Sequence, residues 1–183
     1  MVSTTSQAIL LVDGYNIIGT WSSLKKIKDN HGLEQARNSL IESLVNYTGY
    51  KALEAKIVFD AHYQKSSSYQ EKVGKSVLVH YTSYTETADT YIEKFCASFP
   101  RRNPETDTRI IVATSDQAQR HTVVGYGAEW LSAQGLAKEI DSTKTKERQN
   151  FRSRQKSQGR FLFNSLDTKT QKVLTQMRFG INS

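Results

Sequence analysis

Short apolar runs alternate with amphipathic helical patterns along most of this 183-residue chain. Five runs have the length and the β-branched or aromatic content of buried strands. Near-continuous apolar strands that alternate with helices are typical of a parallel sheet covered on both faces, so we expect an α/β fold with a central, mostly parallel β-sheet. The five runs are residues 8–12, 56–59, 76–80, 109–113 and, more weakly, 129–131.

The segments between these runs differ in their patterns. Apolar side chains recur at helical spacing over residues 33–47 and 91–99, and Pro100 is expected to end the second of these helices. The link between the second and third strands, residues 61–75, shows no helical pattern and is rich in Ser and Lys. We expect this link to be a mobile, partly basic loop.

The C-terminal quarter is predicted to be helical. A long polar helix is expected from about residue 132 to 154, followed by an apolar patch at 161–163 that forms a short strand or a packed turn, and then by a last helix at 167–179. We therefore expect a sheet domain at residues 1–137 and a basic helical extension at 138–183.

The net charge of +7 lies entirely in this extension. Residues 1–137 carry 14 Lys or Arg and 14 Asp or Glu, whereas residues 138–183 carry 11 and 4. Such a basic segment favours an acidic partner, most often nucleic acid, although a basic helix face kept for solubility has the same composition. The candidate RNA-binding residues are Lys144, Lys146, Arg148, Arg152, Arg154, Lys156 and Arg160.

Cysteine content and hydropathy limit the class of protein. Cys96 lies in an apolar helical stretch and is the single cysteine, so we expect a core thiol, no disulfide partner and a reducing, cytoplasmic compartment. No apolar run approaches the ~18 residues that span a bilayer, so no membrane partner is expected.

Acidic side chains follow three of the predicted strands. Asp13 and Asp60 come directly after their strands, and Asp116 comes shortly after residues 109–113. Because ligands bind at the carboxyl ends of strands in open parallel sheets, we expect three carboxylates to meet at one sheet edge. Clustered carboxylates repel one another, and a divalent cation offsets that repulsion. Oxygen-only ligands suit Mg²⁺ or Mn²⁺.

A fourth acidic segment opens the helix after the third strand. Glu86 and Asp89 are three residues apart, a spacing that places both on one helix face. Each acid also has a simpler explanation, because an acid at a helix N-terminus caps it or complements the macrodipole, and Asp13-Gly14 is a common turn pair. The joint placement of the acids at strand ends favours the metal site.

The same positions resemble a known family. The chain resembles NYN-domain, PIN-like ribonucleases of the YacP type, a bacterial family that includes a ribosome-associated endoribonuclease acting on mRNA in the A site. The resemblance runs from Ile9 to about Ile140 and is looser beyond it. It rests on four motifs, which are VDGYNIIG at 12–19, VFDAH at 58–62, ETAD at 86–89 and ATSD at 113–116.

This resemblance implies a PIN-like three-layer sandwich and an endoribonuclease dependent on Mg²⁺ or Mn²⁺, whose RNA substrate is presented on the ribosome. Asn16 is expected to orient a metal carboxylate or a metal-bound water, and Asp60 to support the site. The catalytic metal carboxylates that the motifs imply are Asp13, Glu86, Asp89 and Asp116. The chain departs from the family pattern at residues 117–124 and in the serines at 66–68.

Two other functions remain open at this point. The chain could be a non-catalytic RNA- or ribosome-binding module, in which the acids are structural and the basic extension binds. A small-molecule phosphatase or nucleotide-binding domain explains the acids but not the basic extension. The four histidines lack metal-ligand spacing, and His62, two residues after Asp60, is the one closest to the predicted site.

Overall fold

A computed structural model describes residues 8–60, 67–99, 108–164 and 170, with side chains described as far as residue 151 and at residue 170. Its contacts divide the chain into two compact units, Met1–Asp141 and Ser142–Ser183. The first unit contains a six-stranded sheet with the strand order β3-β4-β2-β1-β5-β6.

Five strands of this sheet are parallel, and β3 alone runs antiparallel, beside β4. The expected α/β fold with a central, mostly parallel sheet is therefore confirmed. All five predicted strands are present. The strands are β1 (Ala8–Asp13), β2 (Glu54–Phe59), β3 (Tyr69–Val73), β4 (Val77–Tyr81), β5 (Arg109–Ala113) and β6 (Glu129–Leu131).

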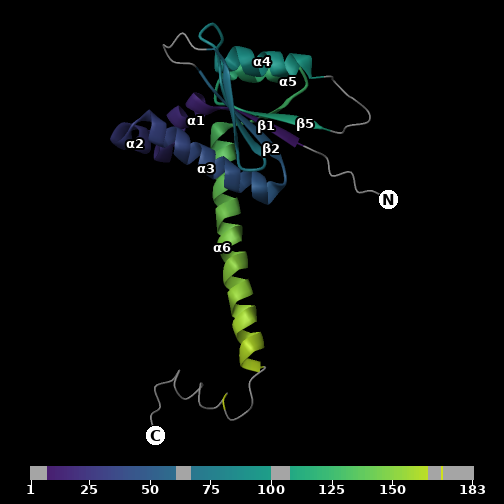
Figure 1. Ribbon diagram of the computed structural model, residues 1–183. Coiled ribbons are helices and arrows are strands. Elements are labelled where there is room, and N and C mark those ends of the chain that lie inside the picture. The colour runs from purple at the N-terminus through teal and green to yellow at the C-terminus, as the bar shows by residue number, and fades with distance from the viewer. Residues whose placement is uncertain (1–7, 61–66, 100–107, 165–169, 171–183) are drawn as a thin grey trace. The chain divides into compact units, whose positions relative to one another are not determined.

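Helices cover both faces of the sheet, as Figure 1 shows. One face carries α1 (Gly14–Thr20), α2 (Ser22–His31) and α3 (Leu33–Lys51). The other face carries α4 (Ala88–Ser98) and α5 (Gln117–Gly125). The last helix, α6 (Ala133–Asn164), begins in the first unit, where Ala133, Leu136 and Ile140 join the core of the α1–α3 face.

Successive residues of a strand enter different cores, because side-chain direction alternates along the strand. In β1, Leu10 and Val12 pack in the larger core on the α1–α3 face, whereas Leu11 packs in the smaller core beneath α4 and α5. Covering both faces in this way makes β1 almost wholly apolar until Asp13, its last residue. The strand ends are thus the first positions at which polar side chains can gather.

The segment expected to be a loop contains β3, so that expectation is wrong for its second half. Residues 69–73 form an edge strand, whereas residues 61–66 lie outside the described part of the chain. The side chains of β3 are mostly exposed and the strand has a single neighbour, so its sequence lacks the apolar alternation that predicts a strand. Charged residues on such an edge strand discourage pairing with other chains. Gly74, with a φ of 66°, turns the chain into β4.

The helices at 33–47 and 91–99 are confirmed as α3 and α4, whereas α1 and α2 were not predicted. The expected strand or packed turn at residues 161–163 is wrong, because α6 continues through it to Asn164. An isolated apolar triplet has no partner strand, while extending an existing helix adds a hydrogen bond for each residue. The expected helix at 167–179 lies outside the described residues except for Thr170, which is helical.

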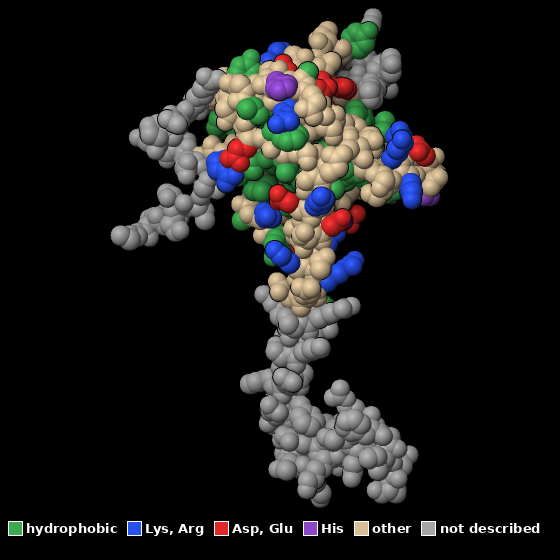
Figure 2. Space-filling model, turned by 180° about the vertical axis from the view of Figure 1, so that it is seen from behind, with side chains coloured by type: hydrophobic (Ala, Val, Ile, Leu, Met, Phe, Trp, Pro, Cys, Tyr) green, Lys and Arg blue, Asp and Glu red, His purple; other side chains and the backbone are tan. Residues whose placement is uncertain are grey.

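The described surface of the first unit mixes charges of both signs. Figure 2 shows Lys and Arg side chains interspersed with Asp and Glu, in agreement with the balanced charge of residues 1–137. Within the described residues, no helix combines the length and the apolar content needed to cross a membrane.

Candidate active site

Four aspartates lie where the chain leaves the carboxyl edge of the sheet. Asp13 ends β1, Asp60 follows β2 directly, and Asp116 stands between β5 and α5. Asp89 lies in the first turn of α4. Asp13 interacts electrostatically with Asp60 and Asp89, and Asp89 also interacts with Asp116. We call these four residues the acid cluster.

Asp13 is the most buried member of the acid cluster and is only 9% exposed. It caps α1, because its Oδ1 accepts a hydrogen bond from the backbone N–H of Asn16 at 3.1 Å. Burial raises the pKa of the Asp13 carboxyl to about 7, and the nearby charges of Asp89 and Asp60 act in the same direction. The carboxyl groups of Asp13 and Asp89 interact with each other, and a proton or a cation between them would offset their repulsion.

Asp60 anchors the start of α4. Its Oδ1 accepts a hydrogen bond from the backbone N–H of Ala88, and the hydroxyl of Thr87 caps the same helix by accepting from Thr90 N at 3.2 Å. These contacts bring Asp89, in the first turn, next to β1. Burial and the charges of Asp116 and Asp60 raise the pKa of Asp89. Asp60 thus holds the backbone at the start of α4, and its supporting role in a metal site stays a prediction.

Gln119 is a site residue that the sequence reasoning missed. It is 2% exposed, and its Nε2 donates a hydrogen bond to Oδ1 of Asp89 at 2.5 Å. The available signal was the spacing of Asp116 and Gln119, which matches a capping box at the start of α5. Asp116 does cap α5, accepting from the backbone N–H groups of Ala118 at 2.7 Å and Gln119 at 3.1 Å. The Gln119 side chain, however, reaches across to α4 rather than back to the cap.

Asn16 joins two of the segments that carry acids. Its side-chain Oδ1 accepts a hydrogen bond from the backbone N–H of Ser115 at 2.8 Å. In addition, the hydroxyls of Thr20 and Ser115 lie 3.2 Å apart. The contact from Asn16 to Asp13 comes from the backbone of Asn16, so its side chain holds α1 against the turn after β5.

Glu86 lies apart from the pairing of Asp13 and Asp89. The expectation that Glu86 and Asp89 share a helix face is wrong, because α4 begins at Ala88 and Glu86 precedes its cap. Glu86 instead forms an ion pair with Lys94, with 2.8 Å between Oε1 and Nζ. The structure therefore groups Glu86 with a lysine rather than with the other acids.

Gly14 is required by packing next to the acid cluster. A Cβ atom at this position would lie 2.2 Å from a ring carbon of Phe59, which is fully buried. Tyr15 packs against the same ring with 5.0 Å between centroids, so the ring cannot move away freely. The glycine after Asp13 lets α1 begin directly against β2.

The donor chemistry of the acid cluster fits Mg²⁺ or Mn²⁺, both of which prefer oxygen ligands. Within the described residues, no three Asp, Glu, His or Cys side chains converge closely enough to hold one ion together. Asp13 and Asp89 interact with each other, and Asp60 and Asp116 each interact electrostatically with at least one of these two. A cation between these carboxylates would offset their repulsion in place of a proton.

Two other reactive side chains in the described part of the chain, those of Cys96 and His80, are not members of the acid cluster. Cys96 is buried as expected, and burial raises the pKa of its thiol to about 11. His80 is buried against Tyr91 with 4.0 Å between ring centroids, and burial lowers the pKa of its imidazole. His62 lies outside the described residues.

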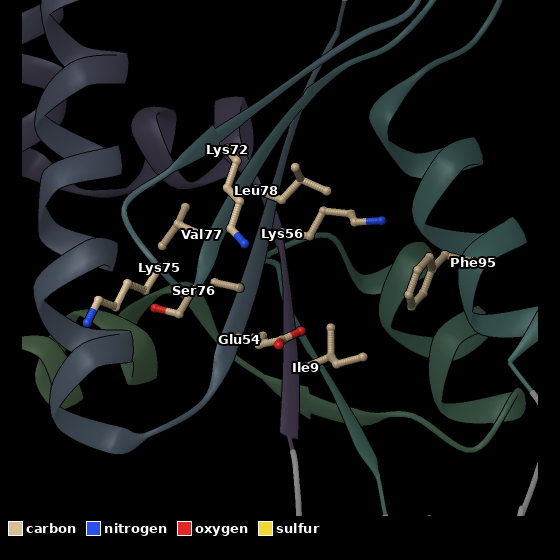
Figure 3. A pocket seen from close by; sticks show the side chains of 10 residues that line it. Ile9, Glu54, Lys56, Lys72, Lys75, Ser76, Val77, Leu78 and Phe95 are labelled. Atoms are coloured by element: carbon tan, nitrogen blue, oxygen red, sulfur yellow. The ribbon is translucent and has the colours of Figure 1, made fainter.

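A groove lies at the opposite, amino end of the sheet (Figure 3). It encloses about 300 Å³ and is lined by the first residues of β2 and β4, by Ile9 and by Phe95 of α4. Lys56 crosses it, with its Nζ 4.7 Å from the ring centroid of Phe95 and 3.1 Å from the hydroxyl of Tyr91. No member of the acid cluster lines this groove, so the groove and the acid cluster are separate features.

The candidate RNA-binding residues of the extension lie on α6. Lys144, Lys146 and Arg148 are exposed there. The other four belong to the same helix, but their side chains lie outside the described part of the structure; they are Arg152, Arg154, Lys156 and Arg160.

Comparison with known proteins agrees with this fold and these motifs. Residues 10–179 match the model of the YacP-like NYN domain family. The chain is 39% identical over 134 residues to the uncharacterised protein YacP of Bacillus subtilis (strain 168), covering 73% of this chain and 75% of that protein. A crystal structure of Rae1 (YacP) from Bacillus subtilis matches with a TM-score of 0.66 and 33% identity, covering 94% of this chain and 95% of that chain. A tryptophan-to-leucine variant of Rae1 matches with a TM-score of 0.66 and 29% identity, covering 92% and 99%.

Proposed function

Because this chain belongs to the YacP-like NYN domain family, we propose that it is a metal-dependent endoribonuclease whose active site is the acid cluster. The observation that carries the proposal is the gathering of four aspartates at one sheet edge, two of them with raised pKa values. Like charges held together in a partly buried place destabilise the fold, and such arrangements are typical of functional sites.

Mg²⁺ or Mn²⁺ is the proposed cofactor. Asp13, Asp89 and Asp116 are the carboxylates proposed to hold it, which requires their side chains to draw closer together when the ion binds. Glu86 is instead engaged with Lys94. When bound, such an ion lowers the pKa of a water molecule and neutralises charge on a scissile phosphate. Hydrolysis by water then leaves RNA products with 5′-phosphate and 3′-hydroxyl ends.

The proposed metal site depends on the titration of Asp13 and on neighbouring side chains that hold the other aspartates in place. With a pKa of about 7, Asp13 releases its proton near neutral pH and can exchange that proton for a cation. Gln119 fixes one oxygen of Asp89 by donating to it, and Asp60 holds the first turn of α4. Asn16 keeps the turn that carries Asp116 against α1.

Incubation of the full chain with single-stranded RNA tests this proposal. We expect cleavage with Mn²⁺ or Mg²⁺ and none with EDTA. Asp13→Asn keeps the shape of the side chain but removes its charge. It is expected to lower the cleavage rate by about 1,000-fold or more, because the loss of a single group that stabilises a transition state already lowers a rate by about 100- to 1,000-fold. Glu54→Gln, a neutralised carboxylate at the amino end of the sheet, is the matched control and keeps the wild-type rate. Equal cleavage by Asp13→Asn and wild type would remove the acid cluster from the chemistry.

RNA on the ribosome is the proposed partner, and the basic extension is proposed to bind its phosphate backbone. Clustered cations bind phosphates by releasing counterions, with a slope of log K against log[salt] of roughly −0.7 per contact for single strands. The triple variant Arg152→Gln, Arg154→Gln, Lys156→Gln should flatten this slope by about 2 for RNA or ribosomes. An unchanged slope means that the extension is a solvated helix face.

A non-catalytic RNA- or ribosome-binding module is the second candidate. It is favoured by the capping roles of Asp13 and Asp116, which explain both acids without a metal. Calorimetric titration with Mn²⁺ separates the two, because a purely structural cluster binds no cation and Asp13→Asn then changes nothing in the titration.

A further inference from the structure

Four aromatic side chains form a continuous row along the carboxyl edge of the sheet. Tyr15 packs against Phe59 with 5.0 Å between ring centroids, Phe59 against Tyr81 at 5.6 Å, and Tyr81 against Tyr69 at 6.2 Å. Strand register produces this arrangement, because Phe59 pairs with Tyr81 across β2 and β4, and Tyr81 pairs with Tyr69 across β4 and β3. We call these four residues the aromatic row.

Exposure rises along the row from Phe59 to Tyr69. Phe59 is fully buried, its two neighbours Tyr15 and Tyr81 are half-buried, and Tyr69 is 57% exposed. The inner residues therefore belong to the core, and their packing explains them. Tyr69 is different, because it lies on an exposed edge strand and offers much of its ring to solvent.

The row and the acid cluster approach the carboxyl edge of the sheet from opposite faces, because Phe59 packs on the α1–α3 face whereas Asp60 is hydrogen-bonded to α4. Phe59 directly precedes Asp60, and Tyr15 lies two residues after Asp13. Neighbouring strands are about 4.8 Å apart, so Tyr69 on β3 lies only two strand spacings, roughly 10 Å, from β2. An extended polymer that crosses this edge can thus contact both the exposed ring and the acids.

A positively charged side chain, that of Arg37, lies beside the aromatic row. The guanidinium of Arg37, on α3, lies 5.9 Å from the ring centroid of Tyr81 and donates a hydrogen bond to the Tyr15 hydroxyl at 3.1 Å. Planar rings beside an arginine are the combination that binds single-stranded nucleic acids, in which bases stack on the rings and phosphates meet the cation. Acids alone repel a phosphodiester, so a positive group near the edge is needed.

We propose that the aromatic row is a binding track for single-stranded RNA, in which a base stacks on Tyr69 and Arg37 contacts the backbone. This inference rests on the proposed ribonuclease function, because it supplies the substrate path to the acid cluster. Stacking is tolerant of sequence, since every base has a flat face. The track therefore selects single strands over duplexes rather than one base over another.

The test measures binding of a short oligoadenylate to full-length protein that carries Asp13→Asn to prevent cutting. Tyr69→Ala is expected to weaken binding by about tenfold, the effect of losing one stacked base. Tyr69→Phe keeps the ring and should bind normally, whereas Tyr69→Leu keeps apolar packing against Tyr81 and should bind like Tyr69→Ala. Tyr50→Ala is the matched control, because Tyr50 is 41% exposed near the end of α3, away from the row.

An abasic oligonucleotide of the same length distinguishes stacking from backbone contact. It should bind wild type and Tyr69→Ala equally, because the lost interaction requires a base. The inference is overturned if Tyr69→Ala binds oligoadenylate like wild type, or if the loss is the same with abasic chains. Metal-dependent cleavage that still requires Asp13 would then leave the proposed function intact, whereas absence of both cleavage and binding would overturn both.

Discussion

The two ends of the central sheet carry opposite kinds of side chains. At the carboxyl edge, four aspartates lie together, and two of them have pKa values raised by burial and by their neighbours' charges. At the amino end, the groove of about 300 Å³ is lined by three lysines and one glutamate: Lys56, Lys72, Lys75 and Glu54. Both ends belong to the same strands, so the contrast arises from what the chain places where it enters and leaves the sheet.

This contrast is the reason why we assign the proposed chemistry by unbalanced charge rather than by hollow space. Lys56 in the groove has partners, because its ammonium lies near the rings of Phe95 and Tyr91. The aspartates at the other end have mainly each other, apart from caps and the bond from Gln119 to Asp89. A group of like charges with few counter-charges favours the binding of an oppositely charged ligand, whereas Lys56 in the groove already has aromatic partners.

The largest expected difference between the two ends is in the pH dependence of stability. The pKa of Asp13 rises from 3.8 to about 7 on folding, so the folded state binds its proton more tightly. The resulting stability is fully present below about pH 4 and is lost as the pH rises through about 7. The loss amounts to up to about 4 kcal/mol. Asp13→Asn should abolish this decline in metal-free urea denaturation between pH 4 and 8, whereas Glu54→Gln at the amino end should retain it.

Divalent cations should stabilise the folded protein through the carboxyl edge of the sheet and not through the amino end. Binding to the native state adds RT ln(1 + [L]/Kd), about 2.7 kcal/mol at ~100 times Kd. Thermal melts in millimolar Mn²⁺ should show this gain for wild type and Glu54→Gln, and a smaller gain for Asp13→Asn. A melting temperature that Mn²⁺ leaves unchanged in wild type contradicts a metal site in the free protein.

Packing behind the acids should make the carboxyl edge less tolerant of small substitutions. Gly14→Ala forces a methyl group into the buried ring of Phe59 and should lower the free energy of unfolding by about 1–3 kcal/mol. Gly49→Ala is the control from the end of α3, where an added Cβ meets nothing within 4 Å. It should raise stability by about 0.5–1 kcal/mol, because alanine favours the helix. Equal effects in denaturant titrations would show that the ring of Phe59 gives way.

The smallest expected difference concerns RNA contacts of single cations. Arg37→Gln, at the aromatic row, should flatten the slope of log K against log[salt] for single-stranded RNA by about 0.7. Lys72→Gln, in the groove at the amino end, should leave that slope unchanged. If the two variants behave in the opposite way, RNA runs past the groove rather than along the aromatic row.

Much of the fold could be predicted from the sequence, because a strand buried on both faces is a local apolar run whatever its neighbours are. The placement of Asp13, Asp60 and Asp116 at strand ends followed from the same pattern. Edge strand β3 escaped prediction because its side chains are exposed and its only stabilising partner is β4. The start of α4 was placed too early, since both Thr87 and Glu86 suit a helix N-terminus and the side chain of Asp60 accepts the N–H of Ala88.

What the sequence by itself determined is therefore the α/β fold, the family and the placement of Asp13, Asp60 and Asp116 at strand ends, all of which reside in short motifs and their order. Only the tertiary structure decided which polar groups meet. The bond from Gln119 to Asp89 joins residues 30 positions apart, and that from Ser115 to Asn16 joins residues 99 apart. The aromatic row likewise depends on β2, β4 and β3 being neighbours in register. Local patterns record whether a residue is buried, but contacts between distant segments depend on how the strands are ordered in the sheet, which no single segment specifies.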